Sequence, residues 1–166
     1  GLDPTLEQPS SVTVQKLSPT FFQIISTDYL AQNFFVMIFA GWVIYGIDAI
    51  FEGHFTTALA IFAAILTPIG LATFYWRYNL IVSTFVNGVE ITGQVTEINI
   101  YSNGKNNRDY IIHYEYEFNG QPHQYRNRVK KNSHAQKLRQ GQTVNLLAHP
   151  KTPHIAFIKE IYLEYI

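Results

Sequence analysis

Two long apolar runs lie next to each other in the first half of the chain. The first covers residues 34–51 (FFVMIFAGWVIYGIDAIF) and the second covers residues 55–76 (FTTALAIFAAILTPIGLATFYW); only Glu52, Gly53 and His54 separate them. The second run carries no charged residue, and at ~1.5 Å per residue it matches the ~30 Å hydrocarbon core of a bilayer. The pattern predicts a transmembrane helical hairpin over residues 30–80. Residues 1–29 are expected to form a flexible arm followed by an interfacial segment.

From residue 86 onward the pattern changes to an alternation of apolar and polar positions, which is typical of half-buried strands. The clearest strand covers residues 109–118 (DYIIHYEYEF), with its aromatic and aliphatic side chains at even positions. Asn119 and Gly120 then predict a tight type I′ turn into a strand over residues 122–129. In the preceding strand, residues 89–100, the apolar positions shift from odd (Val89, Ile91, Val95) to even (Ile98, Ile100). This shift, together with Gly93, predicts a bulge or sharp bend.

The end of the chain predicts a short helix and two further strands. Asn132 or Ser133 is a candidate N-cap for a helix ending near Arg139, strands are expected over residues 143–148 and 154–158, and the tail is a possible helix. About five antiparallel strands with one helical turn are typical of a small β-barrel of OB or SH3-like type. The predicted fold class is therefore an α+β membrane protein, a transmembrane helical hairpin followed by a soluble barrel over residues 86–166.

The second half also has small residues, tyrosines and prolines in a characteristic order. These are Gly93-x-Val95, Tyr110, Tyr114 and Tyr116, Asn119-Gly120, Gly141-x-x-Val144 and His149-Pro150-x-x-Pro153-x-x-Ala156. Over residues 91–158 this order resembles a bacterial family, domain of unknown function 3592, whose members place such a β domain beside one or two transmembrane helices. The family pattern has Tyr before Asp-Pro near its end, where this chain has Ala148-His149. The resemblance implies a fold and brings no catalytic residue.

Small residues in the two apolar runs are candidates for close helix packing, because helices in lipid associate where backbones can approach. The candidates are Gly41, Ala49, Ala60, Ala64 and Gly70. Two interpretations stay open: the hairpin packs on itself, or one face docks onto another membrane protein.

Two polar residues near the tip of the hairpin are candidates for chemistry. Asp48 is an ionisable residue inside a predicted span, which is a functional candidate by default. It lies close enough to the tip to reach the interface or pair there, and an ion or proton role is the alternative. His54 is a candidate ligand for a metal or a pigment, but a lone histidine is weak support, so no metal site is predicted.

Charge is balanced over the whole chain, with 12 basic and 12 acidic residues, so polyanion binding has little support. Four basic residues follow one another in the second half: Arg126, Arg128, Lys130 and Lys131. We expect this patch to contact anionic lipid headgroups or an acidic partner. Nucleic acid is not expected as a partner, because Glu115 and Glu117 share the exposed face.

The charges that flank the two runs predict the orientation of the hairpin. Lys16 precedes the first run and Arg77 follows the second, whereas the tip has no Lys or Arg. The positive-inside rule therefore predicts that both termini and the β domain are cytoplasmic.

The sequence lacks the motifs of common enzymes. It has no cysteine, no HExxH, no phosphate-binding glycine loop and no nucleophile elbow, so we predict no enzyme and no cofactor. His113 and His123 are expected to approach each other across the Asn119-Gly120 turn.

The predicted function is a non-catalytic, membrane-anchored accessory or assembly subunit of a larger membrane protein complex. The alternatives are a tethered barrel that binds a peptide, glycan or nucleic acid, and a membrane-embedded transporter or ion-conducting oligomer that uses Asp48.

Overall fold

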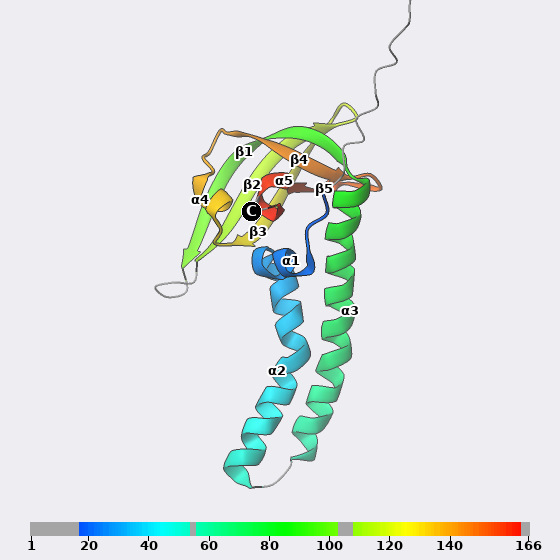
Figure 1. The fold of residues 1–166 in the computed structure, drawn as a ribbon, viewed down its shortest axis with the longest axis vertical. Helices are drawn as coiled ribbons and strands as arrows, with labels where there is room; N and C mark the ends of the chain where they lie inside the picture. Colours follow the sequence, from blue (N-terminus) through cyan, green and yellow to red (C-terminus); the bar gives the residue numbers. More distant parts are fainter. Residues whose placement is uncertain (1–16, 54–55, 103–107, 164–166) are drawn as a thin grey trace, which may run out of the picture.

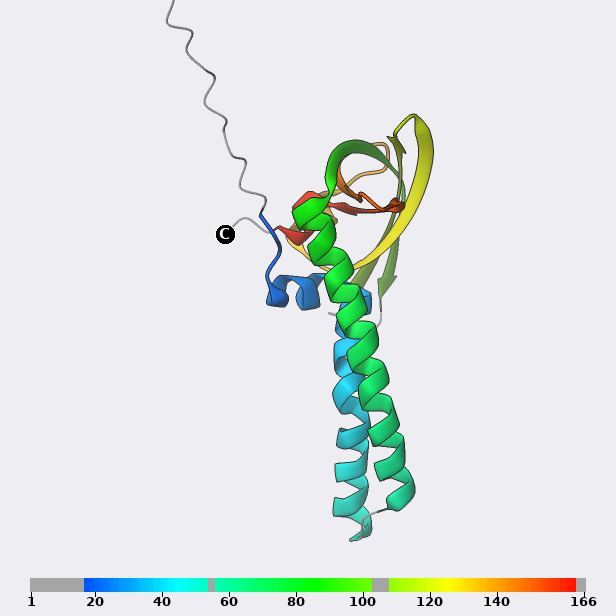
Figure 2. The same cartoon turned by 90° about the vertical axis from the view of Figure 1, so that its right-hand side faces the viewer.

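Two antiparallel helices lead into a strongly curved five-stranded sheet, as the computed structural model shows (Figure 1). It describes residues 17–53, 56–102 and 108–163. A short helix α1 (Phe21–Thr27) precedes the long helices α2 (Tyr29–Glu52) and α3 (Thr57–Asn87). α1 lies across the end of the helix pair where the pair meets the sheet (Figure 2).

Helices α2 and α3 are long and apolar enough to cross a membrane. They contain 24 and 31 residues, and most of their apolar side chains face outward instead of into a protein core. The helical hairpin predicted from the sequence is therefore present.

The end of α3 differs from the prediction. We expected the hairpin to end by residue 80 and the β domain to begin at residue 86, but α3 continues to Asn87 and Gly88 leads directly into the first strand. The helix continues because Ile81 and Phe85 are buried against the sheet. Gly88 is required at the junction, since a Cβ there would lie 2.1 Å from the carbonyl oxygen of Thr84.

The sheet is antiparallel and nearly closed. Its strands are β1 (Val89–Ser102), β2 (Arg108–Phe118), β3 (Gln121–Lys130), β4 (Thr143–His149) and β5 (Thr152–Ile158). Their order is β3-β2-β1-β4-β5, and the two edge strands approach each other. Helix α4 (Ser133–Lys137) lies between β3 and β4 in the chain, and α5 (Lys159–Tyr162) follows β5.

Most local features of the sheet agree with the sequence analysis. Asn119 and Gly120 have φ values of 53° and 75°, as a type I′ turn requires. The pairing of β1 with β2 shifts register between Val95 and Glu97, which is the predicted bulge. Asn132 caps α4, as expected, but α4 ends at Lys137 and β5 begins two residues earlier than predicted.

Tyrosine side chains from β2 connect the two sides of the barrel. The even positions of β2 point inward. The hydroxyls of Tyr114 and Tyr116 donate to the carbonyl oxygens of Ala156 and Pro153, respectively, both on β5. Burial raises the pKa of both phenols, so they stay protonated donors at neutral pH. These bonds join β2 to β5, which is not its neighbour in the sheet.

One hydrophobic core includes residues from the helices as well as from the sheet. Ile24 of α1 and Ile81 and Phe85 of α3 are fully buried in the same cluster as Tyr114 and Phe157. The packing is thus continuous across residues 80–86, where the sequence analysis divided the hairpin from the β domain.

The helices pack along a line of small residues that only partly matches the prediction. Gly41 lies against Ala63, and Gly70 lies against Ile38. Thr67, between these contacts, accepts a hydrogen bond of 2.8 Å from the indole N–H of Trp42 on α2. The predicted packing residue Ala64 is instead exposed, because the contact face of α3 is turned by one residue toward Ala63; Ala49 and Ala60 are half-buried.

We expect Gly41→Ala to destabilise the helix pair and Gly46→Ala to leave it unchanged or slightly stabilised. An added Cβ at Gly41 would lie 2.7 Å from the Cα of Ala63, whereas none of the described atoms lies within 4 Å of a Cβ at Gly46. Overpacking of this kind costs about 1–3 kcal/mol. Thermal unfolding in mild detergent measures both variants, and equal melting temperatures would contradict this packing.

Candidate functional site

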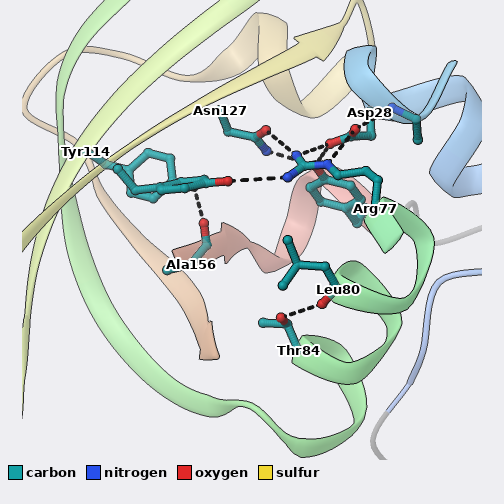
Figure 3. A network of polar contacts seen from close by, with 10 residues as sticks. Asp28, Arg77, Leu80, Thr84, Tyr114, Asn127 and Ala156 are labelled. Atoms are coloured by element: carbon teal, nitrogen blue, oxygen red, sulfur yellow. Dashed lines mark hydrogen bonds and ion pairs between the residues drawn. The ribbon is translucent and has the colours of Figure 1, made fainter. Parts of the chain in front are cut away.

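A buried ion pair lies where the helices meet the sheet (Figure 3). Asp28 connects α1 to α2, and Arg77 lies on the neighbouring helix α3. The guanidinium of Arg77 donates two hydrogen bonds to the carboxylate of Asp28, Nη2 to Oδ2 at 2.7 Å and Nε to Oδ1 at 3.1 Å. Asp28 is 0% exposed and Arg77 is 3% exposed.

The remaining bonding capacity of this pair is used by groups from other elements. Tyr162 on α5 donates its hydroxyl to Asp28 Oδ2 at 2.7 Å, and Asn127 on β3 donates to the Tyr162 oxygen at 2.8 Å. The backbone N–H of Ala31 donates to Asp28 Oδ1 at 2.9 Å, so the carboxylate also caps α2. Burial raises the pKa of the Tyr162 phenol, and the Asp28 charge raises it further, which keeps this donor protonated.

We refer to Asp28, Arg77, Asn127 and Tyr162 as the junction network. A buried ion pair is tolerated only when both charges are well hydrogen-bonded, which this network achieves with side chains from α3, β3, α5 and the α1–α2 connection. Separating the helices from the sheet would expose or unpair these charges. The network therefore holds the sheet in one position relative to the helix pair.

The sequence analysis missed Asp28 and gave Arg77 a different role. Arg77 was interpreted as a marker of orientation flanking the second span, yet it is buried in the ion pair. A signal existed: Asp28 lies six residues before the first apolar run, and Arg77 directly follows the second. In an antiparallel hairpin those two positions lie at the same level.

The four residues of the predicted basic patch have different environments. Arg126 and Lys131 are exposed. Arg128 and Lys130 instead form ion pairs with Asp109, at 2.6 and 3.0 Å.

Arg128 also connects the sheet to the helices. Its guanidinium lies 3.5 Å from the centre of the Tyr29 ring, at the first residue of α2. This part of the patch therefore contacts the start of the long apolar helix α2.

The predicted approach of His113 and His123 is wrong. In the β2–β3 register His113 is opposite Arg126, and His123 is opposite Tyr116, on which its ring stacks. Successive strand positions face opposite sides, so the two histidines lie on different faces of the sheet. Among the described residues no group of three metal-ligating side chains occurs. His54 lies outside the described residues.

Asp48 bonds within the tip of the hairpin. Its carboxylate accepts a hydrogen bond of 2.6 Å from the hydroxyl of Thr56, just before α3. This contact holds the end of α2 against the start of α3.

A polar groove of about 680 Å³ lies on the outside of the sheet. Glu97, His113 and Arg126 occupy matching register positions on β1, β2 and β3, so they form a row across three strands. The other lining residues are Thr96, Tyr114, Gln124, Tyr125 and Gln140. With an acid, an imidazole and a guanidinium side by side, the groove can donate and accept hydrogen bonds to a polar ligand.

A second groove, mostly apolar and of about 690 Å³, follows the outer side of α3. It is lined by Tyr75, Trp76, Asn79, Leu80, Val82, Ser83, Val86 and Asn87. Trp76 lies at the level of Arg77, and Val86 lies three turns nearer the sheet. The exposed apolar side of α3 therefore continues past the junction network.

A comparison with protein-family models gives a match that covers the sheet. Residues 90–160 match the model of the family described as Domain of unknown function (DUF3592). This match confirms the resemblance stated for residues 91–158. No curated protein and no solved structure matches the chain.

Proposed function

We propose that this chain is a non-catalytic, membrane-anchored accessory or assembly subunit of a larger membrane protein complex. In this proposal α2 and α3 cross the bilayer, both termini and the barrel are cytoplasmic, and the barrel covers a cytoplasmic surface of the partner. Membrane lipid and other membrane protein subunits are the partners, and the chain needs no cofactor.

The observation that carries the proposal is the mostly apolar groove along α3, which continues beyond Arg77 toward the sheet. Trp76 and Tyr75 are more than half exposed, and Val86 is 44% exposed although it lies beyond Arg77, next to the sheet. Lipid tails cover apolar side chains within the bilayer but not in the cytoplasm. A partner helix that continues out of the membrane beside α3 would cover both parts.

The junction network supports the same role. A subunit that positions one surface against a partner gains specificity when its own parts do not move, because less freedom is lost on binding. Asp28, Arg77 and Tyr162 hold the barrel to the helices in this way.

The finer assignment of the barrel belongs to this proposal as well. We assign it to the OB type in preference to the SH3-like type, because an OB fold is a five-stranded, partly open Greek-key barrel. The strand order β3-β2-β1-β4-β5, with α4 placed between β3 and β4, supports this assignment.

Extraction of the native protein in mild detergent tests the accessory role. We expect the chain to migrate on a native gel within a larger assembly, whose other subunits mass spectrometry then identifies. Val86→Glu places a charge in the apolar groove and is expected to release the chain from the assembly. The matched control Gln136→Glu, on the exposed side of α4, is expected to leave the assembly intact. A chain that runs alone at native expression levels would contradict the proposal.

A second function is favoured by the polar groove, namely a tethered barrel that binds a peptide, glycan or nucleic acid. Glu97, His113 and Arg126 supply charge of both signs on one exposed surface. Binding by the purified full-length chain, lost in Arg126→Ala and kept in Val86→Glu, would favour this function over the accessory role.

A further inference from the structure

We propose that the last residues of β1 and the first residue of β2, Ile100, Tyr101 and Arg108, rest on the bilayer that α2 and α3 cross and bind anionic lipid headgroups together with neighbouring basic residues of β3; we call this the hairpin end. This inference depends on the proposed membrane location. It adds a second membrane contact, made by the sheet, to the contact made by the two helices.

The first argument is position. In both views the end of β1 and the start of β2 lie level with α1, at the end of the helix pair (Figures 1 and 2). Contacts agree: Arg128 lies over the ring of Tyr29, the first residue of α2, and its guanidinium is 5.7 Å from the ring centre of Tyr101 near the end of β1. The hairpin end is therefore beside the point where α2 begins.

The second argument is exposed apolar surface. Ile100 and Tyr101 are adjacent on β1, and each is 58% exposed. Most other aromatic and aliphatic side chains of the sheet are buried in its core or packed against it. On α1, at the same level, Phe22 is 80% exposed. Tyrosine and other amphipathic aromatic residues are favoured at the membrane–water interface.

The third argument is charge. Arg108 begins β2, and its carbonyl oxygen accepts a hydrogen bond from the N–H of Lys131, so these two exposed basic residues are neighbours. Arg128 and Lys130 lie on the adjoining strand and share the single carboxylate of Asp109. Among the described residues named here, four cations and one anion give a net positive charge, which complements phosphatidylserine or another anionic headgroup.

Site-specific fluorescence in lipid vesicles tests the inference. Because the chain has no cysteine, single-cysteine variants of the full chain need no further substitutions. We would label three variants with nitrobenzoxadiazole: Ile100→Cys, Ile65→Cys near the middle of the apolar run 55–76, and Glu117→Cys near the far end of β2. Quenching by spin-labelled lipids in phosphatidylserine-containing vesicles then reports contact with the bilayer.

We expect strong quenching at position 65, clear quenching at position 100 and none at position 117. Quenching at 65 with none at 100 would overturn the hairpin contact and keep the membrane location. Absence of quenching at 65 would overturn the membrane location, and this inference with it.

Charge variants test whether anionic headgroups are the ligand. Arg108→Gln with Lys131→Gln should lower the equilibrium for contact at position 100 about five-fold for each charge removed. The matched pair Lys137→Gln with Arg139→Gln removes the same charge beside α4, higher on the barrel, and should have no effect (Figure 1). Headgroup binding would be overturned if both pairs of substitutions gave the same quenching at position 100. It would also be overturned if the unsubstituted basic residues gave the same quenching at position 100 in phosphatidylcholine vesicles as in phosphatidylserine-containing vesicles.

Discussion

Arg77→Met is expected to destabilise the folded chain by about 3–5 kcal/mol. The substitution keeps the apolar length of the side chain but leaves the carboxylate of Asp28 fully buried without its cation. Asp28→Asn should cost a similar amount, because it leaves the buried guanidinium unpaired while an oxygen acceptor for Ala31 remains. Urea unfolding in mild detergent, followed by circular dichroism of the sheet, measures both changes.

The double variant separates the ion pair from other effects of these substitutions. Asp28→Asn combined with Arg77→Met removes both charges together, so its cost should be well below the sum of the two single costs. Arg126→Met is the matched control, since Arg126 is exposed, and it should change stability by no more than about 0.5 kcal/mol. If Arg77→Met behaved like Arg126→Met, the junction network would not stabilise the fold.

The isolated β domain, residues 86–166, is expected not to fold. It lacks Ile24, Ile81 and Phe85, which are at most 1% exposed and belong to the core of the sheet. Burying one such side chain contributes about 1.5–3 kcal/mol, and a domain has only about 5–15 kcal/mol of net stability. The fragment also leaves Tyr162 and Asn127 without the charges that they contact.

Amide chemical shifts and cooperative unfolding of the fragment provide the measurement. Two variants of the full chain test the same cause. Phe85→Ala should lower the free energy of unfolding by about 3–5 kcal/mol, whereas Val86→Ala, at the exposed neighbouring position, should lower it little. A fragment with dispersed amide shifts and a cooperative transition would show that the helices are dispensable to the core.

The parts of the fold that the sequence predicted depend on neighbours along the chain. Strand β2 could be predicted because inward apolar and outward polar side chains alternate along it. The turn that follows could be predicted because Asn119 and Gly120 both accept positive φ. The bulge in β1 could be predicted because the apolar positions change from odd to even between Val95 and Ile98, which is where the register shift occurs. The basic patch was also readable as a run of cations, but not its pairing with Asp109.

The parts that could not be predicted depend on contacts between distant segments. Residues 77–87 contain Asn79, Ser83 and Thr84 among apolar residues, so in the sequence the continuous apolar run ends at Trp76. Their helical face becomes clear only when the sheet that covers Ile81 and Phe85 is present. In the same way, the rotation of α3 about its axis places Ala63 and not Ala64 against α2. The spacing of small residues along the sequence does not determine this rotation, because both alanines have small neighbours.

Because α3 is one continuous helix from the hairpin tip to Gly88, a tilt of this helix is transmitted to the barrel. Transmembrane helices adjust to a thinner bilayer by tilting, at a modest free-energy cost. A flexible linker would absorb such a tilt, but α3 enters β1 without one and the junction network holds α2, α3 and the barrel together. In a bilayer, a change in thickness would therefore swing the barrel through the same angle and alter which of its surfaces faces the membrane.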